Sequence, residues 1–168
     1  MGSRRPEGNR RPPLYTVAER ARRDASRWTL VQGVLAPLQF VVFAASLALV
    51  LRYLTTGDGL AAATASVVAK TLVLYTIMVT GSIWEKDVFG QYLFARPFFW
   101  EDVVSMLVLA LHTAYVVAVA FDVGSPREQM YVALAAYASY VINATQFVLK
   151  LRAARLDTRP AALLAGGE

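Results

Sequence analysis

Four long stretches without an acidic residue or an arginine dominate the sequence and restrict the folds open to it. They cover residues 28–51, 60–84, 103–121 and 129–149, and Lys70 is the only charged residue within them. A helix needs about 20 apolar residues to cross the hydrocarbon core of a bilayer, whereas barrel strands are shorter and alternate polar with apolar residues. The sequence therefore predicts an all-α polytopic membrane protein with a bundle of four transmembrane helices.

The composition supports this class and excludes several chemistries. Hydrophobic residues make up 57% of the 168 residues and charged residues 17%, against about 45–50% and about 25% in soluble domains. The chain has no cysteine, which excludes disulfides and thiolate sites, and a single histidine, His112, which excludes a multi-histidine metal centre. Any chemistry must use carboxylates, hydroxyls, amides, lysine or this imidazole.

Flanking signals divide the chain into segments. Residues 1–14 are rich in arginine and proline and predict a disordered basic tail. A capping box from Thr16 to Glu19 predicts a short interfacial helix over 15–27. The transmembrane domain then covers 28–151, with helices about 28–53, 60–84, 100–121 and 127–151, and a C-terminal tail follows over 152–168.

The basic residues predict the orientation of these helices. Fourteen lysines and arginines lie in 1–27, in 85–102 and from 150 onward, whereas the opposite connections hold only Arg52 and Arg127. Cytoplasmic segments of membrane proteins carry the excess of basic residues, so both termini and the middle connection are expected in the cytoplasm. Because this rule accounts for the positive charge, a nucleic-acid partner is not expected.

Each predicted helix carries a stripe of polar side chains on one face. Such groups are costly inside a bilayer, so each is a candidate for function by default. Helical spacing places them toward one another and predicts a polar site within the bundle. The stripes are Gln32, Gln39 and Ser46; Thr71, Tyr75, Met78, Ser82 and Glu85; Glu101, Ser105, His112 and Tyr115; and Ser139, Asn143, Gln146 and Lys150.

Each candidate also has a structural interpretation. Gln39 and Asn143 could hold helices together by hydrogen bonds, as amides in membrane bundles often do. Lys70 could extend its ammonium to the membrane surface instead of binding a ligand within the bundle. His112 is either a hydrogen-bonded core residue or a base, metal ligand or pigment contact.

An acidic cluster flanks the middle connection. Glu85 leaves one predicted helix, and Glu101 and Asp102 begin the next, together with Lys86 and Arg96. Acidic residues at a helix start are stabilised by the helix dipole, so Glu101 and Asp102 could be caps alone. Carboxyl groups that lie close together can instead keep one another protonated, which suits a general acid.

Several long words of the sequence are similar to one known family. They are PLYT at 13–16, WTLVQGVLAPLQF at 28–40, KTLVLYTIMVTGSIWEK at 70–86, FGQYLF at 89–94, FFWED at 98–102, LALHTAY at 109–115 and YVIN at 140–143. Over residues 14–155 the chain resembles the 2-vinyl bacteriochlorophyllide hydratases, also called 3-vinyl bacteriochlorophyllide hydratases.

The resemblance implies a multi-pass enzyme of bacteriochlorophyll biosynthesis in the cytoplasmic or intracytoplasmic membrane of a phototrophic bacterium. The family adds water to the C3-vinyl group of a chlorophyllide or 3-vinyl bacteriochlorophyllide and gives a 3-(1-hydroxyethyl) product. It implies no cofactor, because the magnesium belongs to the substrate, and other enzymes of pigment biosynthesis are possible partners.

Hydration of a vinyl group needs an acid for its terminal carbon and a group that orients water. Glu101 and His112 are about 16 Å apart along one helix, so His112 cannot ligate the substrate's magnesium while Glu101 protonates the vinyl group. We expect His112, with Tyr75 and Asn143, to act on the vinyl group and its water. Glu85, Glu101 and Asp102 form an alternative, shallower acid site.

The remaining expectations concern substrate binding and a second class of function. Lys86 and Arg96 suit the propionate of the substrate at the membrane surface, and Lys70 is a further candidate for substrate binding. The alternative to an enzyme is a pigment carrier or assembly factor without catalytic activity, in which His112 is the axial ligand of the pigment's magnesium.

Overall fold

A computed structural model describes residues 13–165 of the chain, with side chains described as far as residue 155. It consists of five helices, and α2 to α5 are long and apolar enough to cross a membrane. The all-α prediction is therefore confirmed, and the four candidate spans indicate a membrane protein. The helices are α1 (Val17–Ala25), α2 (Arg27–Thr56), α3 (Leu60–Phe89), α4 (Phe99–Ala120) and α5 (Pro126–Ala165).

The helices exceed several of the predicted boundaries. Helix α3 continues to Phe89 before Gly90 ends it at a positive φ of 85°, where glycine has no steric penalty. Helix α5 continues through most of the predicted tail to Ala165, since the residues after 151 include many good helix formers. Of the disordered tail predicted over residues 1–14, residues 1–12 lie outside the described residues, as does the end of the C-terminal tail at 166–168, whereas Leu14 packs against the cluster of Tyr15, Val88 and Phe98.

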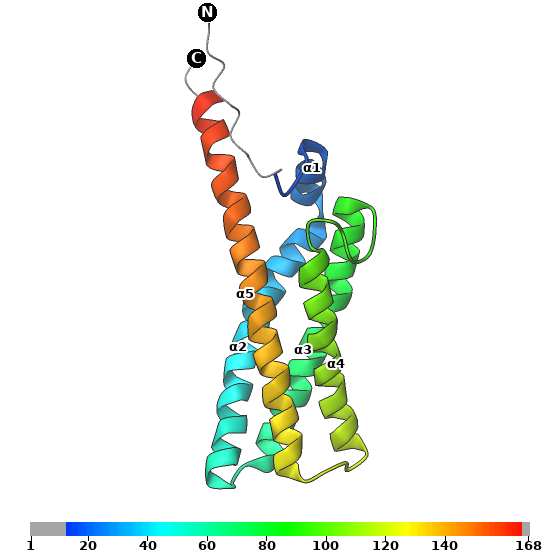
Figure 1. Cartoon of the computed structure of the whole chain (residues 1–168), viewed down its shortest axis with the longest axis vertical. Coiled ribbons are helices and arrows are strands. Elements are labelled where there is room, and N and C mark those ends of the chain that lie inside the picture. The colour runs from blue at the N-terminus through cyan, green and yellow to red at the C-terminus, as the bar shows by residue number, and fades with distance from the viewer. Residues whose placement is uncertain (1–12, 166–168) are drawn as a thin grey trace, which may run out of the picture.

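The four long helices form two hairpins that run side by side (Figure 1). Helices α2 and α3 pack closely along each other, as do α4 and α5, whereas contacts between the two hairpins are fewer. Helix α1, the connection between α3 and α4, and the C-terminal part of α5 all lie at one end, here called the α1 end. The short connections at 57–59 and 121–125 lie at the opposite end.

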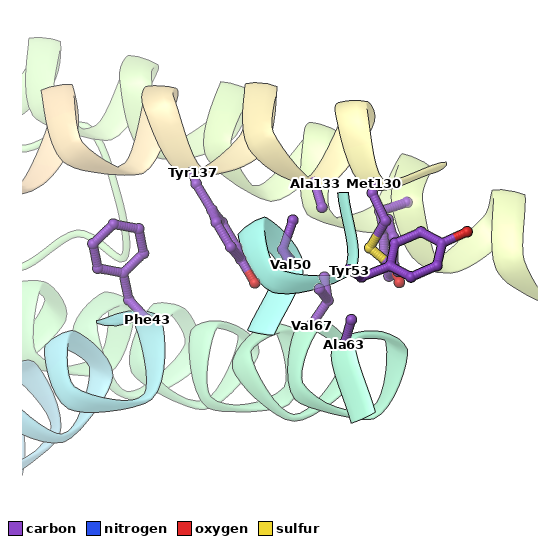
Figure 2. Packing of buried hydrophobic residues seen from close by; sticks show 9 residues of the cluster. Phe43, Val50, Tyr53, Ala63, Val67, Met130, Ala133 and Tyr137 are labelled. Carbon is purple, nitrogen blue, oxygen red and sulfur yellow. The ribbon is translucent and has the colours of Figure 1, made fainter. Parts of the chain in front are cut away.

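A hydrophobic cluster joins the hairpins in the half of the bundle away from α1 (Figure 2). Ala63 and Ala133 are completely buried there and have no bulk beyond Cβ, so the helix backbones approach closely. Tyr137 of α5 points across this cluster, and its hydroxyl is hydrogen bonded to Ser46 of α2. The cluster comprises Phe43, Val50, Tyr53, Ala63, Val67, Tyr115, Met130, Ala133 and Tyr137.

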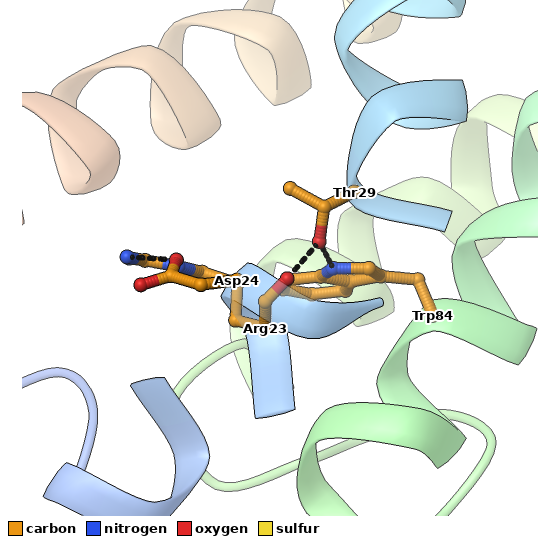
Figure 3. A network of polar contacts seen from close by, with 4 residues as sticks. All are labelled: Arg23, Asp24, Thr29 and Trp84. Carbon is orange, nitrogen blue, oxygen red and sulfur yellow. Dashed lines mark hydrogen bonds and ion pairs between the residues drawn. The ribbon is translucent and has the colours of Figure 1, made fainter. Parts of the chain in front are cut away.

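Helix α1 is tied to the end of α3 by polar and aromatic contacts. The predicted capping box of Thr16 and Glu19 is present. The Thr29 hydroxyl donates to the Arg23 carbonyl at 2.6 Å and accepts from the Trp84 indole at 2.9 Å (Figure 3). Tyr15 stacks on Phe89 with ring centroids 5.8 Å apart. The position of α1 is therefore set by tertiary contacts as well as by its own cap.

We expect Ala133→Leu to destabilise the bundle, because three extra carbon atoms cannot fit between closely packed helices without displacing them. Overpacking of this kind costs about 1–3 kcal/mol. Ala135→Leu is the matched control, since Ala135 is exposed on the same helix. Thermal unfolding in detergent measures both variants, and equal midpoints would contradict the packing described here.

Candidate functional site

The interior of the bundle is polar along much of its length. Every long helix contributes buried polar side chains, so the predicted inward orientation holds for most of the polar stripes. Several of these side chains have hydrogen-bond partners, and several have none. The buried set is Gln39, Ser46, Lys70, Thr71, Glu85, Glu101, Asp102, Ser105, His112, Gln129, Ser139 and Asn143.

Lys70 lies within the bundle and does not extend to the membrane surface. Its side chain is 0% exposed, so the interpretation in which its ammonium reaches the surface is wrong. The Nζ atom lies 3.9 Å from the ring centroid of Tyr140 on α5 and has no hydrogen-bond partner. An aromatic face attracts a cation but accepts no conventional hydrogen bond from it, so the ammonium is left with its donors free.

His112 is held in one orientation with one nitrogen free. Its side chain is 0% exposed, and Nδ1 lies 2.8 Å from the carbonyl of Val108, one turn earlier in α4. Because a carbonyl only accepts, Nδ1 carries a proton, and in the neutral ring Nε2 then has a lone pair. No partner contacts Nε2. The ring packs against Tyr137 at 5.8 Å, between centroids.

Lys70 and His112 lie at the same depth and belong to one centre. Lys70 is ten residues from the start of α3, which is about 15 Å from the end of the bundle opposite α1. His112 is eight residues from the end of α4, which is about 12 Å from the same end. Lys70 contacts Tyr140 and His112 contacts Tyr137, and these two tyrosines are three residues apart on α5. We call Lys70, His112, Tyr137 and Tyr140 the Lys70–His112 centre.

Two other residues expected beside His112 have different surroundings. Asn143 is buried, and its amide nitrogen donates to Ser105 at 2.7 Å, while its Oδ1 has no partner. Tyr75 is only half-buried, and its hydroxyl is hydrogen bonded to Thr113 on an exposed part of α4 at 2.7 Å. The structure thus keeps Asn143 in the interior with His112 and directs the hydroxyl of Tyr75 to an exposed partner.

The acidic cluster at the α1 end has structural partners. Glu85 accepts a hydrogen bond from the backbone N–H of Ala95 at 3.1 Å, and Asp102 accepts one from that of Phe94 at 2.7 Å. The two carboxyl groups also lie within hydrogen-bonding reach of each other. They hold the connection between α3 and α4 against the bundle, including Phe94 at its unfavourable φ of 61°.

The other charged candidates also lie at the α1 end. Glu101 forms an ion pair with Lys150 of α5. Lys86 donates to the carbonyl of Gly90 at 2.9 Å and is exposed, as is Arg96. These cations therefore lie where an anionic group at the membrane surface could reach them. Within the part of the chain that the structure describes, no cluster of three or more metal-ligating side chains occurs.

Two tyrosines of the centre were not among the sequence candidates. Tyr137 and Tyr140 are three residues apart on α5 and supply the surfaces against which His112 and Lys70 lie. Their spacing is that of one helix face, but nothing in the sequence indicates which residues of the other helices they would meet. Only the packing of the two hairpins brings them to the centre.

Fold and site together define a polytopic helical membrane protein with an internal centre of nitrogen groups that lack hydrogen-bond partners. The family model of 2-vinyl bacteriochlorophyllide hydratases matches residues 15–153. The chain belongs to the 2-vinyl bacteriochlorophyllide hydratase family. It is accordingly a hydro-lyase of bacteriochlorophyll biosynthesis. Of the two functions expected from the sequence, an enzyme and a non-catalytic pigment carrier, family membership therefore supports the enzyme.

Two curated relatives carry the same description. The chain is 69% identical over 149 residues to 2-vinyl bacteriochlorophyllide hydratase of Cereibacter sphaeroides, covering 88% of this chain and 92% of the relative. It is 64% identical over 152 residues to that of Rhodobacter capsulatus, covering 90% and 88%. No solved structure matches the chain.

We expect Glu85→Ala to loosen the connection between α3 and α4, because the amide of Ala95 loses its acceptor. A buried donor left without a partner costs about 1–3 kcal/mol. Hydrogen exchange of the peptide covering residues 90–98 should become faster, while that of α2 should not change. Asp58→Ala, in the exposed opposite connection, is the control. Unchanged exchange at 90–98 would contradict the holding role of Glu85.

Proposed function

We propose that this enzyme hydrates the C3-vinyl group of 3-vinyl bacteriochlorophyllide or a related chlorophyllide, and that the reaction takes place at the Lys70–His112 centre. The names of the two relatives supply the substrate class. The observation that carries the location is the pair of buried nitrogens without hydrogen-bond partners, Nζ of Lys70 and Nε2 of His112. Polar groups at this depth are costly unless a ligand or function uses them.

The proposed binding mode follows from the polarity of the substrate. Its propionate remains at the membrane surface at the α1 end, near Lys86 or Arg96, while the apolar macrocycle extends into the bundle. The vinyl group is then directed to the centre. Contacts between the two hairpins are fewer than those within them, which suits a flat ring between them. The magnesium is part of the substrate, and no electron is transferred, so no cofactor is proposed.

The proposed reaction has three proton transfers that balance. Lys70 as an ammonium donates a proton to the terminal carbon of the vinyl group, and the cation formed at the inner carbon is delocalised into the macrocycle. A water molecule attacks that carbon while Nε2 of His112 accepts its proton, which leaves the 3-(1-hydroxyethyl) product. The proton then returns from His112 to Lys70, which restores the starting protonation of both residues.

Asn143 and the acidic residues take different roles in this proposal. The free Oδ1 of Asn143 can accept a hydrogen bond from the attacking water. Glu85 and Asp102 already accept hydrogen bonds from the connection, and Glu101 is paired with Lys150. We therefore assign the three carboxylates to the structure of the α1 end. The arrangement gives no such support to Tyr75.

We also propose that the α1 end faces the cytoplasm, with the enzyme in the cytoplasmic or intracytoplasmic membrane of a bacterium. The excess of lysine and arginine in the segments of that end supports this orientation.

His112→Phe should abolish hydration while pigment binding persists, because the ring volume remains but the proton acceptor is lost. Removal of a general base lowers the rate by about 100-fold or more. Membranes containing the variant are supplied with 3-vinyl bacteriochlorophyllide, and a product heavier by one water is sought by mass spectrometry. Thr113→Val is the control on the same helix. Normal turnover by His112→Phe would exclude the proposed centre.

Lys70→Met should lower activity and at the same time raise the thermal stability of the pigment-free protein. Methionine fills a similar volume without the cost of burying a cation that lacks a hydrogen-bond partner. Thermal unfolding in detergent and hydration of the vinyl substrate are measured on the same preparations. If Lys70 were only a structural residue, both quantities would decrease together.

A further inference from the structure

Gln39 of α2 is a buried amide that neither the fold nor the proposed reaction uses. Its side chain is 2% exposed, and both Nε2 and Oε1 lack a hydrogen-bond partner. The interpretation of Gln39 as a residue that holds helices together by hydrogen bonds is therefore wrong for this state of the protein. Burial of an amide without partners is unfavourable, so the group is expected to meet a ligand.

The free donor of Gln39 indicates what kind of ligand group would meet it. Among the buried carboxamides in the described part of the chain, Gln39 alone has a nitrogen without an acceptor. Asn143 donates to Ser105, and Gln129 donates to the carbonyls of Ala118 and Val123. An uncharged donor in an apolar interior suits a carbonyl oxygen, which offers lone pairs and needs no charge compensation.

The position of Gln39 relates it to the Lys70–His112 centre. Phe43, one turn farther along α2, packs on Tyr140 and Tyr137, with ring centroids 4.9 Å and 5.4 Å apart. These are the tyrosines that contact Lys70 and His112. Gln39 therefore lies between one and two helical turns from the centre, about 6–10 Å toward the α1 end. This separation is comparable to the width of a tetrapyrrole ring.

We propose that Gln39 donates a hydrogen bond to the ketone oxygen on the fifth ring of the substrate and thereby sets its orientation. The inference rests on the proposed function, in which the propionate stays at the α1 end and the vinyl group reaches the centre. The ketone lies across the macrocycle from the vinyl group and on the same side as the propionate. A macrocycle bound in this way places its ketone toward Gln39. Gln39 is thus a positioning residue and a determinant of specificity.

The test combines two proteins with two substrates. Wild-type enzyme and Gln39→Leu are each given the vinyl substrate and an analogue in which the ketone oxygen is replaced by two hydrogens. The wild-type enzyme should have a kcat/KM about tenfold lower for the analogue, because a buried donor then loses its acceptor. Gln39→Leu should lose a similar factor on the normal substrate and should distinguish the two substrates less than twofold.

Gln32→Leu is the matched control, because Gln32 lies two turns earlier on α2 and its amide already donates to Thr80 at 2.8 Å. This variant should retain the wild-type preference for the ketone. If Gln39→Leu retains that preference as well, the proposal is overturned. The proposal is also overturned if the wild-type enzyme has the same kcat/KM for both substrates. The amide of Gln39 would then be hydrogen bonded only to water.

The carbonyl stretch of the bound pigment provides a readout that does not need turnover. Resonance Raman spectra should show the ketone band at lower wavenumber in wild-type protein than in Gln39→Leu. An identical band in the two proteins would overturn the role of Gln39, even if vinyl hydration takes place. If wild-type protein shifts the band but makes no hydrated product, the proposed function fails and the contact of Gln39 with the pigment remains.

Discussion

The structure depends on the need of polar groups inside a lipid bilayer to find partners within the protein. No water is available in the hydrocarbon core, so each unpartnered group carries an energetic cost that a soluble protein would avoid. Ser46, Tyr137, Ser105 and the amide nitrogen of Asn143 meet this condition through hydrogen bonds between helices. Nζ of Lys70, Nε2 of His112 and the amide of Gln39 do not, and these atoms lie on three different helices that face a common interior.

The two groups of polar residues are separated along the bundle. At the α1 end, the buried carboxyl groups accept hydrogen bonds from the amides of the connection or pair with Lys150, so each has a partner. Deeper in the bundle, a cation and an imidazole lie beside aromatic rings with donors and a lone pair still available. Such a division suits an enzyme whose substrate has one anionic substituent and an otherwise apolar ring.

The sequence predicted the four spans and most of the inward-facing polar stripes because both follow from local periodicity. The environment of Lys70 could not be predicted, since extension to the surface and burial are equally compatible with a lysine near the middle of a span. Tyr75 shares a stripe with Thr71, yet its hydroxyl finds a partner in Thr113. That difference depends on how α3 and α4 cross, which is tertiary information. Helix α5 extends past residue 151, the boundary predicted from the sequence, because the residues that follow include many good helix formers.

The unpartnered groups also imply that the polar core of the pigment-free protein is incomplete. A methionine at position 70 and a leucine at position 39 would fill similar volumes without burying unpartnered polar atoms. The presence of lysine and glutamine there therefore costs stability that only a ligand can restore. A ligand that binds the folded state alone stabilises it in proportion to the logarithm of its concentration over Kd. Substrate binding and completion of the polar core are, in this view, the same event.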